Sequence, residues 1–109
     1  MSLDGEGRIR IRTRRNGESC VLELSGRLDA TSHRALKAAY EPPLASASVK
    51  ELLLDLADLD VLDSSAFGLL LILRERGLAR NKSVYLVNSR GQVAEALAQA
   101  KFYPLFPAP

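Results

Sequence analysis

The chain has 109 residues, of which 47% are hydrophobic and 26% are charged. This length suits one domain, and this balance is typical of a globular protein with a buried core. The net charge of +2 is too small to indicate nucleic-acid binding. The single cysteine, Cys20, excludes an intrachain disulfide and favours a reducing cytoplasm. The longest apolar run, Phe67 to Leu73, is far shorter than the roughly 20 residues of a membrane helix, so no membrane insertion is expected.

The N-terminal part predicts a β-hairpin. Residues 1–7 are small and polar and carry no secretion signal, so we expect a disordered N-terminus followed by one domain over residues 8–109. From Arg8 to Thr13 arginine alternates with isoleucine, which is the period of a half-buried strand. Asn16-Gly17 is a strong turn signal because both residues tolerate positive φ. A second strand, Cys20 to Leu24, completes the hairpin.

A helix is expected to follow this hairpin. It should begin near Ala30, where Asp29, Thr31 or Ser32 can cap it. Pro42-Pro43 is predicted to stop the helix, although one further turn is possible. Helical spacing gives it a buried stripe of Ala35, Leu36, Ala39 and Tyr40.

The central part predicts a buried strand and a long helix. Val49 to Leu56 is the strand, and the continuous leucines at 52–54 favour burial on both of its faces. A loop is expected from Ala57 to Leu62. A leucine-rich helix should run from residue 64 to about residue 79.

The last third continues the alternation of strands and helices. Lys82 to Val87 predicts a strand, Gln92 to Lys101 a helix, and the proline-rich tail from Phe102 to Pro109 a short edge strand. The resulting order is β-β-α-β-α-β-α. It predicts an α/β fold with a mixed sheet, in which an N-terminal antiparallel hairpin precedes parallel strands and helices pack on the sheet.

No group of side chains in the sequence indicates catalysis or a cofactor. His33 is the one histidine, and no phosphate-binding glycine loop is present, so we expect no enzyme and no catalytic residue. The acidic residues between Asp55 and Asp63 alternate with apolar residues and lack a calcium loop, so we interpret them as solvated acids and expect no metal. The arginines of residues 8–15 are interpreted as the wet face of an edge hairpin, with an anionic partner as the alternative and no direct nucleic acid.

The segment Asp63-Ser64-Ser65 is more informative, since three capping residues stand before one apolar helix. One cap is enough for structure, and we assign that part to Ser65. What remains is an accessible Ser64 hydroxyl at the positive end of a helix, where phosphate is readily accepted. A phosphate there would add about −1.5 to −2 charge units and could switch a docking surface while the fold stays intact.

This part of the chain resembles a known family. Leu54 to Leu70, which contains Asp-Ser-Ser, resembles the signature of STAS domains, the anti-sigma factor antagonists, in which Asp-Ser-Ser-Gly-Leu-Gly opens a helix. Leu24 to Asp29 resembles the family's Leu-x-Gly-x-Leu-Asp. The sequence departs from the pattern at Ala66 and Phe67, where glycine and leucine are usual. The resemblance covers residues 8–106 and implies the STAS (sporulation anti-anti-sigma factor-like) fold.

The resemblance also implies a function. The protein would be a bacterial, cytoplasmic regulator of transcription that binds an anti-sigma factor and thereby releases a sigma factor. That partner would also be a serine protein kinase that phosphorylates Ser64 and abolishes binding, and a phosphatase of the PPM type could restore it. Asp63 would support the phosphorylation site, and Asp29 would lie on the same surface. The partner-binding residues implied are Asp29, Asp63, Ser64, Ser65 and Phe67.

A second hypothesis stays open. The chain could be a constitutive STAS interaction subunit of a stressosome-like or lipid-transport ATPase complex that is not regulated by phosphorylation. The leucines and isoleucine of residues 69–73 favour it, because they exceed what one buried stripe requires. Both hypotheses predict protein binding, and only the first predicts that Ser64→Asp abolishes it.

Overall fold

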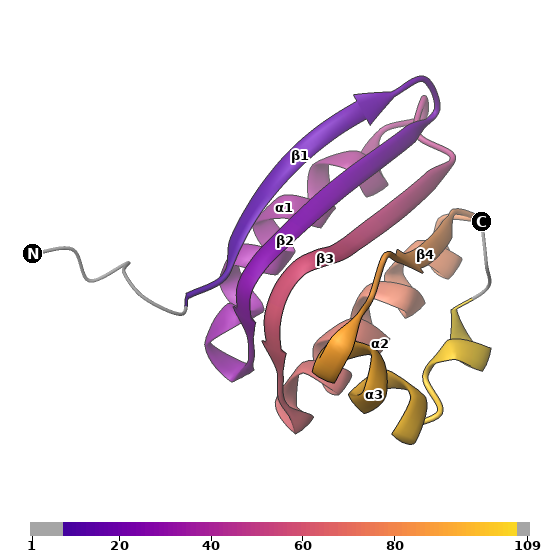
Figure 1. The fold of residues 1–109 in the computed structure, drawn as a ribbon. Helices are drawn as coiled ribbons and strands as arrows, with labels where there is room; N and C mark the ends of the chain where they lie inside the picture. Colours follow the sequence, from indigo (N-terminus) through magenta and orange to yellow (C-terminus); the bar gives the residue numbers. More distant parts are fainter. Residues whose placement is uncertain (1–7, 107–109) are drawn as a thin grey trace, which may run out of the picture.

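The computed structural model describes residues 8–106, so the disordered segment expected at residues 1–7 lies outside it, as do residues 107–109. The elements are β1 (Arg10–Asn16), β2 (Ser19–Leu28), α1 (His33–Ala45), β3 (Glu51–Leu62), α2 (Ser64–Ala79), β4 (Ser83–Val87) and α3 (Gly91–Gln99), with 3-10 helices at Ala30–Ser32 and Tyr103–Leu105. The strand order is β1-β2-β3-β4, with β1 and β2 antiparallel and the other pairs parallel (Figure 1). The predicted mixed sheet and element order are confirmed.

The hairpin forms at the position predicted from the sequence. Gly17 has a φ of +64°, which an L-residue with a side chain adopts only under strain. Asn16 pairs with Ser19 beside the turn, and the register continues to Arg10 opposite Ser25. This register puts Ile11 beside Leu24 on the core face and sends Arg12 to the other face beside Glu23.

Burial alternates along β3, which decides where the core lies. Leu52, Leu54 and Leu56 are 0% exposed, whereas Leu53 is only partly buried. Figure 1 shows α1 and α2 behind the sheet, against the face that carries the fully buried leucines. The expectation that residues 52–54 are buried on both faces is therefore wrong, because the side chain of Leu53 points to the opposite face of the strand.

The loop predicted from Ala57 to Leu62 is also wrong, since β3 continues to Leu62. The strand β2 is longer than expected as well and stays paired with β3 up to Leu28. The register of this pair shifts twice, between Glu23 and Ser25 and between Gly26 and Arg27, and at each shift β3 advances by one residue more than β2. The continued ladder satisfies backbone groups that a loop would have to direct to water.

The helix α1 passes through Pro42 and Pro43, so the prediction that they stop it is wrong, and the further turn left open above is the one observed. Both prolines lie near the C-terminal end, where Pro43 and Leu44 are buried in the core. Their burial offsets the backbone hydrogen bonds that proline removes. Of the predicted stripe, Leu36 and Tyr40 are buried, Ala39 is partly buried and Ala35 is exposed.

The helix α2 has the predicted bounds. The elements after β4 differ from the sequence prediction. The helix α3 ends at Gln99, because Lys101 has a φ of +58° and breaks helical geometry. In residues 102–106 the chain forms a short 3-10 helix, so the predicted edge strand is wrong for this described part of the tail. The rings of Phe102 and Phe106 are buried and stack 5.9 Å apart, which a helical turn permits and a strand would prevent.

Candidate functional site

The two motifs singled out in the sequence meet at one edge of the sheet. Leu28 is the register partner of Leu62, and the N–H of Asp63 donates to the carbonyl oxygen of Leu28 at 3.3 Å. Asp29 directly follows the end of β2, and Asp63 directly follows the end of β3. The two strands are parallel neighbours, so their C-terminal ends lie side by side. The structure therefore brings both aspartates to the side of the domain where α2 begins (Figure 1).

The N-cap of α2 is Asp63. Its Oδ1 accepts the N–H of Ser65 at 2.9 Å and the N–H of Ala66 at 3.3 Å. The assignment of the cap to Ser65 is wrong, because a cap residue stands outside the helix with extended backbone. Asp63 meets this condition with φ −97° and ψ 178°, whereas Ser65 lies within the first turn.

Ser64 is the first residue of α2 and is exposed. Its hydroxyl makes no hydrogen bond to any residue between 8 and 106. The hydroxyl thus stands in solvent at the positive end of a helix of 16 residues, with no structural contact that a modification would break.

Asp29 has a structural task of its own. Its Oδ1 accepts the N–H of Thr31 at 2.9 Å and also the Thr31 hydroxyl, and its own N–H donates to Ser32 Oγ at 3.1 Å. The hydroxyl of Thr31, more than any other group, lowers the pKa of Asp29, and Arg27 at 3.7 Å adds to this. Asp29 is therefore a carboxylate at neutral pH, and with Asp63 it makes the surroundings of Ser64 acidic.

The two positions that depart from the family pattern face the interior. Ala66 is fully buried, so its methyl group points away from the solvent beside Ser64. Phe67 is partly buried, and its ring centroid lies 4.6 Å from that of Phe102. Phe67 thus fastens the start of α2 to the C-terminal segment, and only part of its ring is available to a partner.

Two further residues support the site: Ser32, which the sequence offered only as a possible helix cap, and Arg27, which sequence reasoning missed. Ser32 is fully buried, and its hydroxyl donates to the carbonyl oxygen of Arg27 at 3.1 Å. It holds the turn after β2 in place, and only its position three residues after Asp29 could have indicated this. Arg27 contributes the cation nearest to Asp29. An isolated arginine at a strand end gives no sequence signal for such a role.

Metal-ligand clusters and membrane-spanning helices are both absent from the part of the chain that the structure describes. Within it, no three His, Cys, Asp or Glu side chains are grouped as metal ligands would be. In the same residues, no helix has the length and apolar character needed to cross a bilayer.

Comparison with solved structures defines the class of fold. The anti-sigma factor antagonist SpoIIAA in its unphosphorylated form has a TM-score of 0.74 at 20% identity, covering 90% of this chain and 86% of that chain. Its phosphorylated form, from Bacillus, has a TM-score of 0.68 at 19% identity, covering 90% and 89%. An anti-sigma factor antagonist from Mycobacterium paratuberculosis has a TM-score of 0.74 at 22% identity, covering 97% and 86%. The fold is that of these antagonists.

Sequence comparison then gives the family. The family model described as "Mlab, STAS domain" matches residues 11–104. A STAS-domain containing protein of Pseudomonas aeruginosa (strain UCBPP-PA14) is 32% identical over 91 residues, which is 84% of this chain and 88% of the relative. The chain belongs to the STAS-domain family.

Because Asp63 is the cap of α2, alanine substitutions at residues 63 and 65 should differ in their effect on the free energy of unfolding. Asp63→Ala should lower the free energy of unfolding by about 1 kcal/mol, because two N–H groups of α2 lose their acceptor. Ser65→Ala is the matched control and should change it by less than about 0.5 kcal/mol. Urea unfolding followed by circular dichroism measures both. A larger loss for Ser65→Ala would contradict the assignment.

Proposed function

We propose that this protein is an anti-sigma factor antagonist that is switched by phosphorylation of Ser64. The observation that carries the proposal is the exposed Ser64 hydroxyl, which makes no hydrogen bond within residues 8–106 and stands at the start of α2. The kinship with STAS domains supports it, as does the structural similarity to two anti-sigma factor antagonists.

In this proposal the switch is electrostatic. Phosphorylation adds about −1.5 to −2 charge units to a surface that already carries the carboxylates of Asp29 and Asp63. The fold tolerates the group, because the Ser64 hydroxyl loses no internal bond and the N-terminus of α2 stabilises an anion. A partner that fits the unmodified surface closely would then bury the phosphate against a like charge, or without a cation to pair with it. Either case costs several kcal/mol of binding free energy.

The partner in this proposal is an anti-sigma factor that is also a serine protein kinase. Binding of the unphosphorylated chain releases a sigma factor in the cytoplasm, and a phosphatase of the PPM type reverses the modification. The partner contacts Ser64 and Ser65, offers cations to Asp29 and Asp63, and packs on the exposed part of Phe67. The chain itself is a binding protein in this scheme, not an enzyme.

A second candidate function rests on a different surface. Leu71, Ile72 and Leu78 of α2 are 37%, 43% and 53% exposed. These side chains favour a permanent protein contact, as in a constitutive subunit of a stressosome-like or lipid-transport ATPase complex. Such a contact would be insensitive to Ser64 and would be lost in Ile72→Glu.

Phosphorylation itself is tested first. The protein is incubated with the serine kinase of its own organism that carries anti-sigma activity, with ATP, and the modified residue is mapped by mass spectrometry. We expect one phosphate on Ser64, none on Ser64→Ala, and normal modification of Ser65→Ala. Modification at any other residue, or none at all, would contradict the proposal.

Binding separates the two candidate functions. Ser64→Asp should weaken binding of the same kinase by at least about tenfold, measured by isothermal titration calorimetry. Ser83→Asp is the matched control, because it adds the same charge to an exposed serine at the start of β4, the opposite end of the parallel strands. We expect Ser83→Asp to bind like the unaltered protein. Retained binding in Ser64→Asp together with its loss in Ile72→Glu would favour the constitutive subunit.

A further inference from the structure

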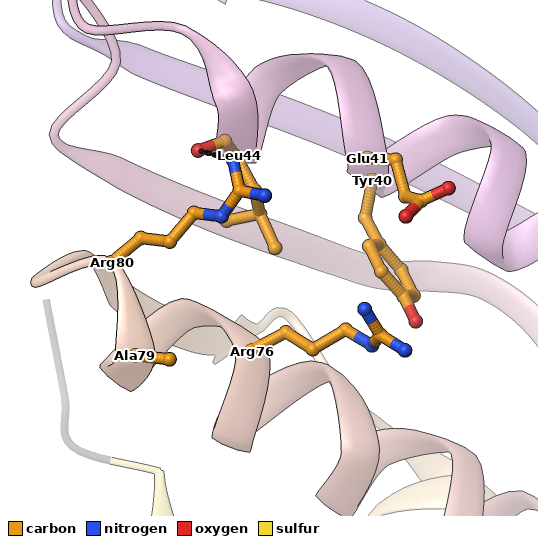
Figure 2. A pocket seen from close by; sticks show the side chains of 6 residues that line it. All are labelled: Tyr40, Glu41, Leu44, Arg76, Ala79 and Arg80. Atoms are coloured by element: carbon orange, nitrogen blue, oxygen red, sulfur yellow. Dashed lines mark hydrogen bonds between the residues drawn. The ribbon is translucent and has the colours of Figure 1, made fainter.

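A cleft lies between the C-terminal halves of α1 and α2, at the opposite end of α2 from Ser64 (Figure 2). Its volume is about 250 Å³. The side chain of residue 79 is a methyl group, which leaves the cleft open between its longer neighbours. Six residues line it: Tyr40, Glu41, Leu44, Arg76, Ala79 and Arg80.

Tyr40 directs an unpartnered hydroxyl into this cleft. The residue is only 2% exposed, yet its hydroxyl makes no hydrogen bond to the rest of residues 8–106. No side-chain polar atom in that range is both fully enclosed and unpaired, so the hydroxyl oxygen reaches the cleft. Figure 2 shows the ring lying between the helices with its oxygen beside Arg76. Burial raises the pKa of Tyr40, which keeps the hydroxyl protonated as a donor at neutral pH.

Two guanidinium groups face the same space. Arg76 lies in the last turn of α2 and Arg80 directly follows the end of this helix, and Figure 2 shows both side chains turned toward α1. Arg80 is positioned by one hydrogen bond, from Nη1 to the carbonyl oxygen of Leu44 at 3.3 Å, which leaves its other donors available. Arg76 makes no hydrogen bond or ion pair within the described chain.

The charge of the cleft is positive overall. Glu41 also lines it but forms no ion pair with either arginine in the structure. The donors of Arg76 and the remaining donors of Arg80 are therefore available to a ligand. The Glu41 carboxylate at the rim can accept a hydrogen bond from a hydroxyl group of that ligand.

We infer that this cleft binds the phosphate group of a small organic phosphate. Arginine forks match phosphate oxygens, and the Tyr40 hydroxyl adds a donor from the other helix. The volume of about 250 Å³ is below the roughly 300–1,000 Å³ of sites for larger ligands, so it suits a phosphate with a few carbon atoms. The site needs no contact with Ser64, so it is independent of the proposed switch.

Binding is tested by NMR titration of the whole protein with glycerol 3-phosphate, with inorganic phosphate, and with vesicles containing phosphatidic acid. We expect saturable shifts at Tyr40 and Arg76 with glycerol 3-phosphate, with a Kd of about 1 mM or tighter. Response to the soluble phosphates alone identifies a free small molecule, and an added response to vesicles identifies a lipid headgroup. No saturable shift with any of the three probes would overturn the inference.

Variants test whether the named side chains carry the binding. Arg76→Gln should weaken binding of glycerol 3-phosphate about tenfold or more, and Arg34→Gln, which removes the same charge from an exposed position on α1, should leave it unchanged. Equal weakening by both variants would show a non-specific charge effect and overturn the inference.

A conservative variant tests the hydroxyl. Tyr40→Phe should weaken binding severalfold while leaving the Tm without ligand unchanged or raised, because the hydroxyl it removes has no partner in the protein. A lower Tm without ligand would mean that the hydroxyl serves the fold, and would overturn its part in the site.

Discussion

Lys82→Met is expected to lower the free energy of unfolding by about 3 kcal/mol, since it removes two buried charge-assisted hydrogen bonds. Lys82 is 9% exposed, and its Nζ donates to the carbonyl oxygens of Ser46 and Val49, the latter at 2.6 Å. Those oxygens belong to the connection between α1 and β3. Methionine fills similar space but donates nothing, so both carbonyl groups lose their partner.

The control for Lys82→Met is Lys50→Met. Lys50 is exposed and its side chain makes no hydrogen bond within residues 8–106, so this change should alter the free energy of unfolding by less than about 0.5 kcal/mol. Both variants are compared by urea unfolding at neutral pH. An equal effect of the two would mean that the buried amine contributes nothing beyond its charge.

The same glycine-to-alanine substitution is expected to have opposite effects on stability at two positions of α2. A β carbon at Gly77 would lie 2.6 Å from Val84 Cγ2 and 3.4 Å from the carbonyl oxygen of Lys82. Val84 is buried and β-branched, so it cannot turn aside cheaply. Gly77→Ala should therefore lose about 1–2 kcal/mol of stability even though alanine is the better helix former.

Gly68→Ala is the matched case. Nothing lies within 4 Å of a β carbon built there. The substitution should raise the free energy of unfolding by up to about 1 kcal/mol, through helix propensity alone. Thermal unfolding of both variants measures the difference. If Gly77→Ala were also stabilising, the close approach of α2 to β4 would not be what requires glycine at this position.

The elements that sequence alone predicted correctly are those whose causes are local. The alternation from Arg8 to Thr13 and the Asn16-Gly17 turn act within a few residues, and the hairpin formed as predicted. The bounds of α2 were also predicted, because a polar cap and a run of helix formers determine where a helix begins. The resemblance to STAS domains likewise came from short segments, Leu54 to Leu70 and Leu24 to Asp29.

Predictions failed where a distant partner decided the outcome. The loop expected after Leu56 is strand, because β2 supplies partners as far as Leu28. The helix α1 continues past Pro43, because the core covers that residue and the next. Residues 103–105 form a 3-10 helix where a strand was predicted, because Phe102 packs against Phe67 of α2. None of these contacts leaves a pattern within one short window of sequence.

The candidate sites divide in the same way. The sequence by itself determined that Ser64 stands at a helix start behind an aspartate, since capping is a property of adjacent residues. Only the tertiary structure decided that Asp29 lies on the neighbouring strand end, and that Tyr40 and Arg76 share a cleft. The physical reason is that parallel strand pairing and helix packing join residues far apart in the chain, and neither is specified by local propensity.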